Sequence, residues 1–285
     1  MYETILVGFD ESSSSNAALT EAAHWVKRHG GRIILVHAVY FDEEEFGIAP
    51  DQLDRRLKVG EKICLQAKES LTAGFGVEVE SLLCEGDPPD VIMDVANGKK
   101  ADLIVLGTYG RKGLKRLLMG SVTSQVIVNS PTDVLVVKKP CAECSGTYRS
   151  ILVPFDGSAS SERALERACH LSRVDNSGIT GLYVIPRYEE MVEFFRTSSI
   201  QKSLHFEAQK IIEKAKKLAS DKGVTIKTLI SEGDAGEKIA ETADMEGSDL
   251  VVMGTCGWRG MNRAILGSST ERVVTHATCP ILVVS

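Results

Sequence analysis

Residues 101–110 read ADLIVLGTYG, and residues 248–257 read SDLVVMGTCG. Each stretch joins an apolar run, 103–107 or 250–254, to a turn that contains glycine. A run that is apolar at every position is typical of a strand covered by helices on both faces, as in a parallel sheet. These stretches therefore predict an α/β protein in which a glycine-rich turn follows a buried strand.

The chain repeats itself once. Residues 4–12, TILVGFDES, recur as SILVPFDGS at 150–158, and SLLCEGDP at 81–88 recurs as LISEGDAG at 229–236. Asp10 returns as Asp156 and Gly107 as Gly254, at offsets of 146 and 147 residues. So uniform a spacing predicts two copies of one fold. We expect a first domain over residues 1–140, a linker over 141–148 in a polar stretch with proline and glycine, and a second domain over 149–285.

Short β-branched runs alternate with helix-length segments in both copies. The runs span 5–9, 33–39, 77–83, 103–107 and 134–137 in the first copy, and 151–155, 178–185, 225–230, 250–254 and 281–284 in the second. Between them, segments such as 13–28 and 160–173 carry Ala and Leu at helical spacing and begin at serine-rich caps. This βαβ alternation predicts an open, doubly wound parallel sheet of five strands in each copy.

Composition excludes several classes of protein. The 285 residues are 43% hydrophobic and 25% charged with a net charge of -6, so nucleic acid is not an expected partner. No apolar run reaches the ~20 residues that span a bilayer, and the first ten residues do not resemble a signal peptide, so we expect a soluble cytoplasmic protein with no membrane partner. The seven cysteines are odd in number and lie mostly in apolar segments, which indicates buried, reduced thiols.

Candidate ligand-binding residues follow strands, because ligands of doubly wound sheets bind beyond the carboxyl ends of the strands. Asp10 and Asp156 follow the first strand of each copy. The fourth strand of each copy runs into the pattern Gly-x2-Gly-x9-Gly-Ser, made by Gly107, Gly110, Gly120 and Ser121, and by Gly254, Gly257, Gly267 and Ser268. Glycines let the backbone approach an anion, and the helical segments 122–128 and 270–274 would turn free N–H groups toward a phosphate. Basic side chains in the turns could meet outer phosphates: Arg111, Lys112, Lys115, Arg116, Arg259 and Arg263.

With this doubled motif the chain resembles the ATP-binding branch of the universal stress protein family over nearly its whole length. The resemblance includes the opening strands with Asp10 or Asp156, the Gly-Asp turns at 86–87 and 233–234, and the closing runs VLVV and ILVV. It implies Rossmann-like sheets of the adenine nucleotide α-hydrolase type, with strand order 3-2-1-4-5. It also implies ATP or AMP as the ligand. Mg2+ or Mn2+ would be bound together with the nucleotide phosphates, and we expect no separate metal site formed by the protein alone.

The family pattern implies a role for each matching position. Asp10 and Asp156 would lie by the ribose and the metal-bridged phosphates, and the backbone at Ala38 and Val184 would read the adenine edge. The motif glycines and serines would cradle ribose and phosphates. The implied nucleotide-binding set is completed by their neighbours Gly8, Leu106, Arg111, Val122, Pro154, Met253 and Ser269. Because the first turn has four basic residues and the second two, we expect the sites to differ in triphosphate preference.

Plainer interpretations stay open. Glycine-rich turns follow strands in many proteins without a ligand, Asp10 and Asp156 could serve only as helix N-caps, and the basic side chains could form a solvated surface. Cys141 and Cys144 have the spacing of a redox or metal half-site, but a single pair favours chance spacing in a linker. The acidic and aromatic segments 41–60 and 187–203 could be ordinary approaches to a helix or lids over the nucleotide.

The preferred function is a nucleotide-dependent switch in the stress response, in which ATP or AMP binding changes a surface seen by a partner protein. No Walker A lysine and no nucleophile elbow points to an enzyme. A slow ATP hydrolase, with Asp10 or Asp156 positioning a metal or water, and a nucleotide-free scaffold are the alternatives. The resemblance also implies that the fifth strands, 134–137 and 281–284, pair in an intramolecular pseudo-dimer, with homodimerisation as a further expectation.

Overall fold

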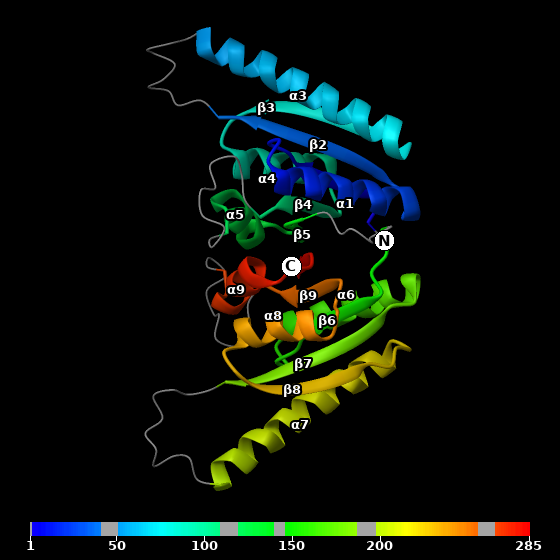
Figure 1. Ribbon diagram of the computed structural model, residues 1–285, viewed down its shortest axis with the longest axis vertical. Coiled ribbons are helices and arrows are strands. Elements are labelled where there is room, and N and C mark those ends of the chain that lie inside the picture. The colour runs from blue at the N-terminus through cyan, green and yellow to red at the C-terminus, as the bar shows by residue number, and fades with distance from the viewer. Residues whose placement is uncertain (1, 41–50, 109–118, 140–145, 187–197, 256–265) are drawn as a thin grey trace. The chain divides into compact units, whose positions relative to one another are not determined.

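The computed structural model describes residues 2–40, 51–108, 119–139, 146–186, 198–255 and 266–285. The chain divides into two compact units, Met1–Thr147 and Tyr148–Ser285, and each has its own five parallel strands between helices (Figure 1). The predicted α/β fold with parallel sheets is thereby confirmed. The predicted linker over 141–148 lies largely outside the described residues.

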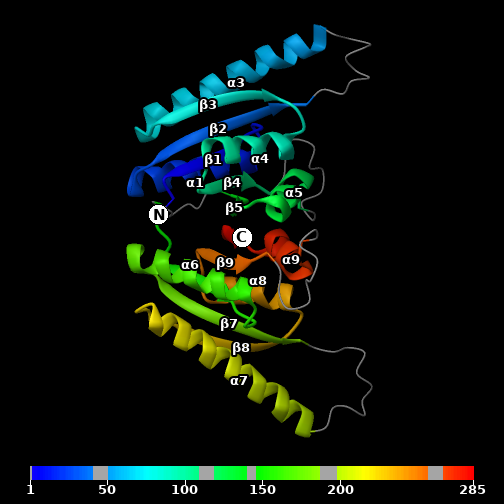
Figure 2. The same ribbon diagram turned by 180° about the vertical axis from the view of Figure 1, so that it is seen from behind.

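The first unit runs in the order β1 (Thr4–Gly8), α1 (Ser13–His29), β2 (Arg32–Val39), α3 (Asp51–Phe75), β3 (Val79–Glu85), α4 (Pro88–Lys99), β4 (Leu103–Gly107), α5 (Ser121–Asn129) and β5 (Asp133–Val137). Its strands pair in parallel in the order β3-β2-β1-β4-β5, which confirms the predicted order 3-2-1-4-5. Helix α1 contacts α3, and α4 contacts α5, so one pair of helices covers each face of the sheet (Figure 2).

The second unit repeats this plan as β6 (Ser150–Pro154), α6 (Ala159–Asp175), β7 (Gly178–Pro186), α7 (Ser198–Asp221), β8 (Lys227–Gly233), α8 (Ala235–Met245), β9 (Leu250–Gly254), α9 (Ser268–His276) and β10 (Ile281–Val284). Its strands are parallel in the order β8-β7-β6-β9-β10. Helices α6 and α7 cover one face, and α8 and α9 cover the other. The order reverses between β6 and β9, where a doubly wound sheet binds its ligand.

Strands β3 and β8 lie further along the chain than the sequence predicts. The predicted runs 77–83 and 225–230 become Val79–Glu85 and Lys227–Gly233, whereas the other eight strands agree within one residue at each end. The cause is pairing with a long neighbour, because β2 aligns Val39 with Glu85 and β7 aligns Pro186 with Gly233. Apolar periodicity reports burial, and it does not report where a partner strand continues the ladder.

The central strands form the core of each unit. Residues 5–7 of β1 and 151–153 of β6 are 0% exposed because helices cover both faces. At the amino end of each sheet, one carboxylate accepts two backbone N–H groups: Asp102 from Glu3 and Thr4, and Asp249 from Arg149 and Ser150. The duplication therefore extends to side-chain contacts.

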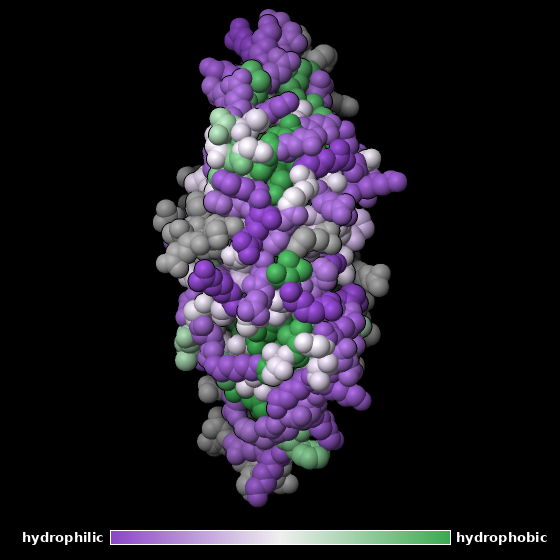
Figure 3. Space-filling view, turned by 90° about the vertical axis from the view of Figure 1, so that its right-hand side faces the viewer, coloured by the Kyte–Doolittle hydropathy of each residue, from purple (hydrophilic) through white to green (hydrophobic). Residues whose placement is uncertain are grey.

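Apolar side chains gather inside the units, and hydrophilic residues predominate on the face shown in Figure 3, where apolar residues form small groups. None of the helices in the described ranges combines the length and the apolar composition needed to cross a membrane.

Candidate functional site

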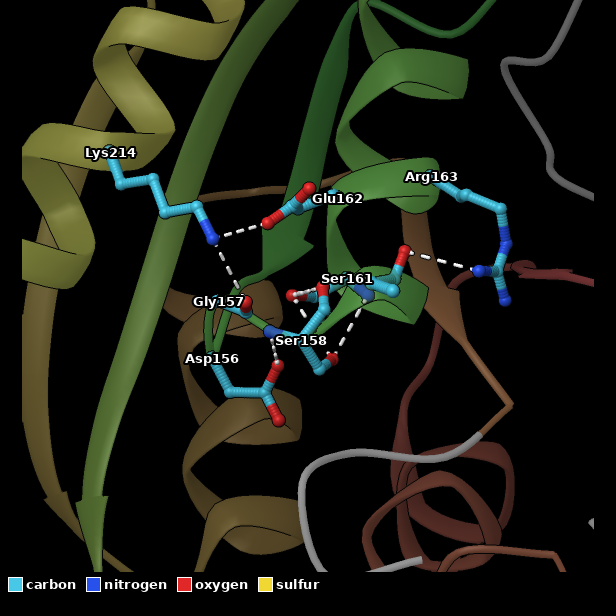
Figure 4. A network of polar contacts seen from close by, with 8 residues as sticks. Asp156, Gly157, Ser158, Ser161, Glu162, Arg163 and Lys214 are labelled. Carbon is cyan, nitrogen blue, oxygen red and sulfur yellow. Dashed lines mark hydrogen bonds and ion pairs between the residues drawn. The ribbon is translucent and has the colours of Figure 1, made fainter. Parts of the chain in front are cut away.

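An aspartate follows the first strand of each unit and is fixed by the backbone just ahead of it. Asp10 Oδ1 accepts the Ser12 amide at 3.0 Å, and Asp156 Oδ1 accepts the Ser158 amide at 3.0 Å (Figure 4). The residue in between has a left-handed backbone, with φ of 62° at Glu11 and 80° at Gly157. This tight turn holds each carboxylate at the carboxyl end of its sheet.

The alternative that these aspartates cap the following helices is wrong. Ser12 is the N-cap of α1 and accepts the Ser15 amide at 3.1 Å, and Ser158 is the N-cap of α6 and accepts the Ser161 amide at 3.2 Å. Because each aspartate bonds to the amide two residues ahead of it, the cap position falls to the serine. The carboxylates of Asp10 and Asp156 therefore do not act as the N-caps of α1 and α6.

The fourth strand of each unit ends in a glycine for a reason that the sequence did not reveal. A Cβ on Gly107 would stand 2.6 Å from the Ser14 Oγ, and one on Gly254 would stand 2.8 Å from the Ser160 Cβ. The first turn of α1 or α6 thus fills the space where a side chain would be. Sequence reasoning attributed these glycines to close approach by an anion, but packing of a neighbouring helix already requires them.

Helices α5 and α9 begin at the Gly-Ser pairs of the motif, as predicted. Their N-caps are Gly120 and Gly267, both extended, and neither provides a side-chain cap. The Gly120 amide donates to the Thr108 carbonyl at 2.9 Å, and the Gly267 amide donates to the Thr255 carbonyl at 3.3 Å. A helix start without a capping side chain presents backbone N–H groups and the positive end of the helix dipole, which favour anions.

The second unit has a cavity of about 130 Å³ at the carboxyl end of its sheet. Six of the residues that the family pattern nominates line it: Pro154, Asp156, Val184, Met253, Gly254 and Ser269. They come from β6, β7, β9, α9 and the loop after β6, which are far apart in the sequence. Gly267 and Ser268, at the start of α9, immediately precede the lining residue Ser269.

The nominated residues of the first unit lie at the corresponding places. Gly8 is the last residue of β1, and Ala38 is the second-to-last residue of β2. Leu106 and Gly107 end β4, and Gly120, Ser121 and Val122 lie at the start of α5. A Cβ on Gly8 would stand 2.6 Å from Leu106 Cδ2 and 3.1 Å from Ile92 Cδ1. Gly8 therefore contacts apolar side chains of its own unit, whereas its counterpart Pro154 lines a cavity.

Part of the predicted site lies outside the described residues. This part comprises Gly110, Arg111, Lys112, Lys115, Arg116, Gly257, Arg259 and Arg263. Cys141, Cys144 and Cys256 and most of the proposed lid segments lie there as well. Of the described cysteines, Cys64, Cys169 and Cys279 are buried free thiols and Cys84 is partly exposed.

Several walls of the cavity were missed by sequence reasoning. Ala235 and Ile239 reach it from α8, Tyr183 from β7, and Ser161 from α6. Ala235 and Ile239 are four residues apart, so they share one face at the start of a helix. Their position directly after the Gly233-Asp234 turn was a usable signal, because that turn also follows the carboxyl end of a strand.

An ion pair lies at the start of α8, next to the lining residue Ala235. Asp234, the N-cap of α8, accepts the Glu237 amide at 3.0 Å and pairs with Arg272 of α9 at 2.8 Å. Burial raises the pKa of Asp234, but these hydrogen bonds and the Arg272 charge outweigh it, so the net pKa lies below its usual value. Among the described residues, no group of three or more His, Cys, Asp and Glu side chains could hold a metal ion.

Comparison with known proteins agrees with this architecture. The model of the universal stress protein family matches residues 1–138 and 147–285. A universal stress protein of Methanocaldococcus jannaschii is 36% identical over 140 residues, which make up 48% of this chain and 82% of that protein. One of Thermus aquaticus is 37% identical over 143 residues, 48% of this chain and 100% of that protein. The crystal structure of a universal stress protein from Archaeoglobus fulgidus has the same fold, with a TM-score of 0.74 at 18% identity over 99% of this chain and 98% of its own.

Proposed function

This chain belongs to the universal stress protein family, and we propose that it binds an adenine nucleotide, ATP or AMP, at the carboxyl end of the sheet in each unit. The observation that carries the proposal is the cavity of the second unit, where six residues nominated by the family pattern line one space. The cavity combines apolar walls with a carboxylate, hydroxyl groups and a strand end at a glycine, and this combination of many apolar and few polar groups is typical of small-molecule sites.

Four of the nominated lining residues have a defined role in this proposal. Asp156 binds the ribose and the metal-bridged phosphates, the backbone at Val184 reads the adenine edge, and Pro154 and Met253 supply apolar contact. A volume of about 130 Å³ is well below the roughly 300–1,000 Å³ of complete small-molecule sites, so in this proposal the cavity forms only part of the nucleotide site.

The phosphates extend from the cavity to the N-terminus of α9. Ser268 and the residues that follow it in the first turn of α9 present backbone N–H groups there without a capping side chain, whereas the Gly267 N–H already donates to the Thr255 carbonyl. A Mg2+ or Mn2+ ion would be carried by the phosphates, and Asp156 would supply a carboxylate toward it. Gly257 and the basic residues of the same turn complete the proposed phosphate site.

The first unit binds a second nucleotide in the same way. Asp10 takes the place of Asp156, and the backbone at Ala38 takes that of Val184. The start of α5, at Gly120 and Ser121, receives the phosphates, together with Gly110 and Arg111. Binding makes the protein a nucleotide-dependent switch, because the bound nucleotide changes the surface that a partner protein meets.

Calorimetric titration of the full chain with ATP tests the proposal. Wild type should bind ATP at two sites, and Asp156→Asn and Asp10→Asn should each weaken one of them. The control is Asp221→Asn, which removes the same charge from an exposed position at the end of α7. Binding that is absent in wild type, or equal in all four proteins, would contradict the proposal.

Two further measurements separate the alternatives. Sustained phosphate release by wild type, far above that of Asp156→Asn, would favour a hydrolase. Failure of ATP to raise the unfolding temperature would favour a nucleotide-free scaffold. Cytoplasmic location, a pseudo-dimer of the two units and a homodimer stay predictions, and light scattering distinguishes one chain from two.

A further inference from the structure

A single lysine ties the loop that carries Asp156 to helix α7. Lys214 Nζ donates to the Gly157 carbonyl oxygen at 3.2 Å and forms an ion pair with Glu162 in the first turn of α6. Figure 4 shows the lysine reaching from α7 to both acceptors. Its partner Gly157 lies 57 residues away in the sequence, between two residues that line the cavity, Asp156 and Ser158.

One peptide group joins this lysine to the candidate ligand carboxylate. The peptide between Gly157 and Ser158 turns its carbonyl oxygen to Lys214 and its N–H to Asp156 Oδ1, at 3.2 and 3.0 Å. A cation at the oxygen polarises the peptide and strengthens the hydrogen bond that its N–H donates. Lys214 and the Asp156 carboxylate are therefore connected through one peptide group.

The first unit makes the same contacts with a different donor. The Glu11 carbonyl accepts from Asn16 Nδ2 at 3.2 Å, and the Ser12 amide donates to Asp10 Oδ1 at 3.0 Å. Asn16 is neutral and belongs to α1, the helix that the loop itself begins. In the first unit this carbonyl thus accepts from a neutral side chain of the following helix, whereas in the second unit it accepts from a charged side chain of another helix.

We propose that Lys214 is a positioning residue of the nucleotide site in the second unit and couples that site to α7. The inference rests on the nucleotide binding proposed above. Lys214 fixes the Gly157–Ser158 peptide, and that peptide orients Asp156 toward the ribose and the metal-bridged phosphates. A shift of α7 changes the affinity of the second site and leaves the first site unchanged.

Loss of Lys214 should change the affinity for the ligand more than the free energy of unfolding. The side chain of Lys214 is 48% exposed and that of Glu162 is 34% exposed, so solvent screens their ion pair and its contribution to stability is small. Loss of the lysine leaves the Gly157 carbonyl without its charged donor, which weakens the hydrogen bond from Ser158 to Asp156, so more of the carboxylate's ordering falls on ligand binding.

Titration of the full chain with ATP and Mg2+, followed by NMR, tests the proposal because the Ser158 and Ser12 amides report on the two units separately. Lys214→Met should weaken binding at the Ser158 reporter by about three- to tenfold and change it by less than about twofold at the Ser12 reporter. Lys214→Arg should restore most of the affinity. The matched control is Lys216→Met, which removes another lysine of α7, one that forms an ion pair with Glu213 of the same helix.

A double variant separates positioning from general damage to the unit. In an Asp156→Asn background, Lys214→Met should have little further effect, because its action passes through the carboxylate. Equal weakening at both reporters, an equal effect of Lys216→Met, or full additivity with Asp156→Asn would overturn the role of Lys214. Wild-type ATP affinity in Lys214→Met would overturn it while leaving nucleotide binding intact. Absence of ATP binding in wild type would overturn both proposals.

Discussion

Gly254, at the end of β9, lies directly against Ser160 in the first turn of α6. A Cβ atom on Gly254 would stand 2.8 Å from the Ser160 Cβ and 2.9 Å from its carbonyl carbon. In the first unit, Gly107 has the same relationship to Ser14 and Ser15, at 2.6 and 2.7 Å. A helix start thus packs on the end of the strand that leads into the motif, and it excludes a side chain whether or not a ligand is bound.

The variant Gly254→Ala should therefore destabilise the ligand-free protein. Its methyl group would overlap backbone and Cβ atoms of α6, and overpacking of this kind costs about 1–3 kcal/mol. Urea denaturation without nucleotide measures the change in the free energy of unfolding. The matched control is Gly74→Ala in α3, where a Cβ has open space and a helical alanine should stabilise by up to about 1 kcal/mol. Equal stability of the two variants would contradict the close packing at Gly254.

Two buried threonines in the first unit should respond oppositely to valine. Thr108 is 1% exposed, and among the described residues its hydroxyl has no hydrogen-bond partner, so Thr108→Val should be neutral or stabilise by up to about 1 kcal/mol. Thr123 donates to the Gly107 carbonyl at 2.7 Å, so Thr123→Val should destabilise by about 1 kcal/mol. Thermal unfolding compares them, and a larger loss for Thr108→Val would contradict this assignment of partners.

The charge of Asp234 should contribute stability that depends on pH. Its folded-state pKa lies below the ordinary value of 3.8, so the contribution is present above that value and is lost as the pH falls through the folded-state pKa. Asp234→Asn keeps the helix cap and removes the charge, so it should cost about 0.5 kcal/mol at neutral pH, since the group is largely exposed. Denaturation between pH 7 and acid should show this difference closing below about pH 4. A difference that does not vary with pH would argue against the ion pair with Arg272.

Cys64 should be almost unreactive in the folded protein. Burial, with a smaller effect of Cys84, raises the pKa of Cys64 to about 11, so little thiolate exists near neutral pH. Alkylation by iodoacetamide at pH 8, followed by peptide mass mapping, should modify Cys64 at least about tenfold more slowly in the folded chain than in urea. The partly exposed Cys84 should react faster than Cys64. Rapid alkylation of Cys64 without denaturant would contradict its burial.

The fold could be predicted because the chain gives the same pattern twice. Apolar runs located eight of the ten strands within one residue at each end. Serine-rich stretches located the starts of α1 and α6, whose N-caps are Ser12 and Ser158. Strands β3 and β8 were misplaced because their ends depend on pairing with β2 and β7, which periodicity within one segment does not encode.

The candidate site could be predicted at strand ends and less well elsewhere. Glycines, aspartates and helix starts next to strands carry local signals, and residues such as Asp156 and Met253 do line the cavity. Lys214 reaches the loop that carries Asp156 from a helix 57 residues further along the chain, so only tertiary packing brings it there. The reason for Gly254 was likewise out of reach, because the atoms that exclude a side chain belong to Ser160.

A crystal structure of the full chain grown with ATP and Mg2+ tests the central claim most directly. The account predicts adenosine density between Pro154 and Met253, the ribose beside Asp156, and phosphates at the N-terminus of α9. A structure whose cavity stays empty at saturating ATP, or whose nucleotide binds away from these residues, would contradict it.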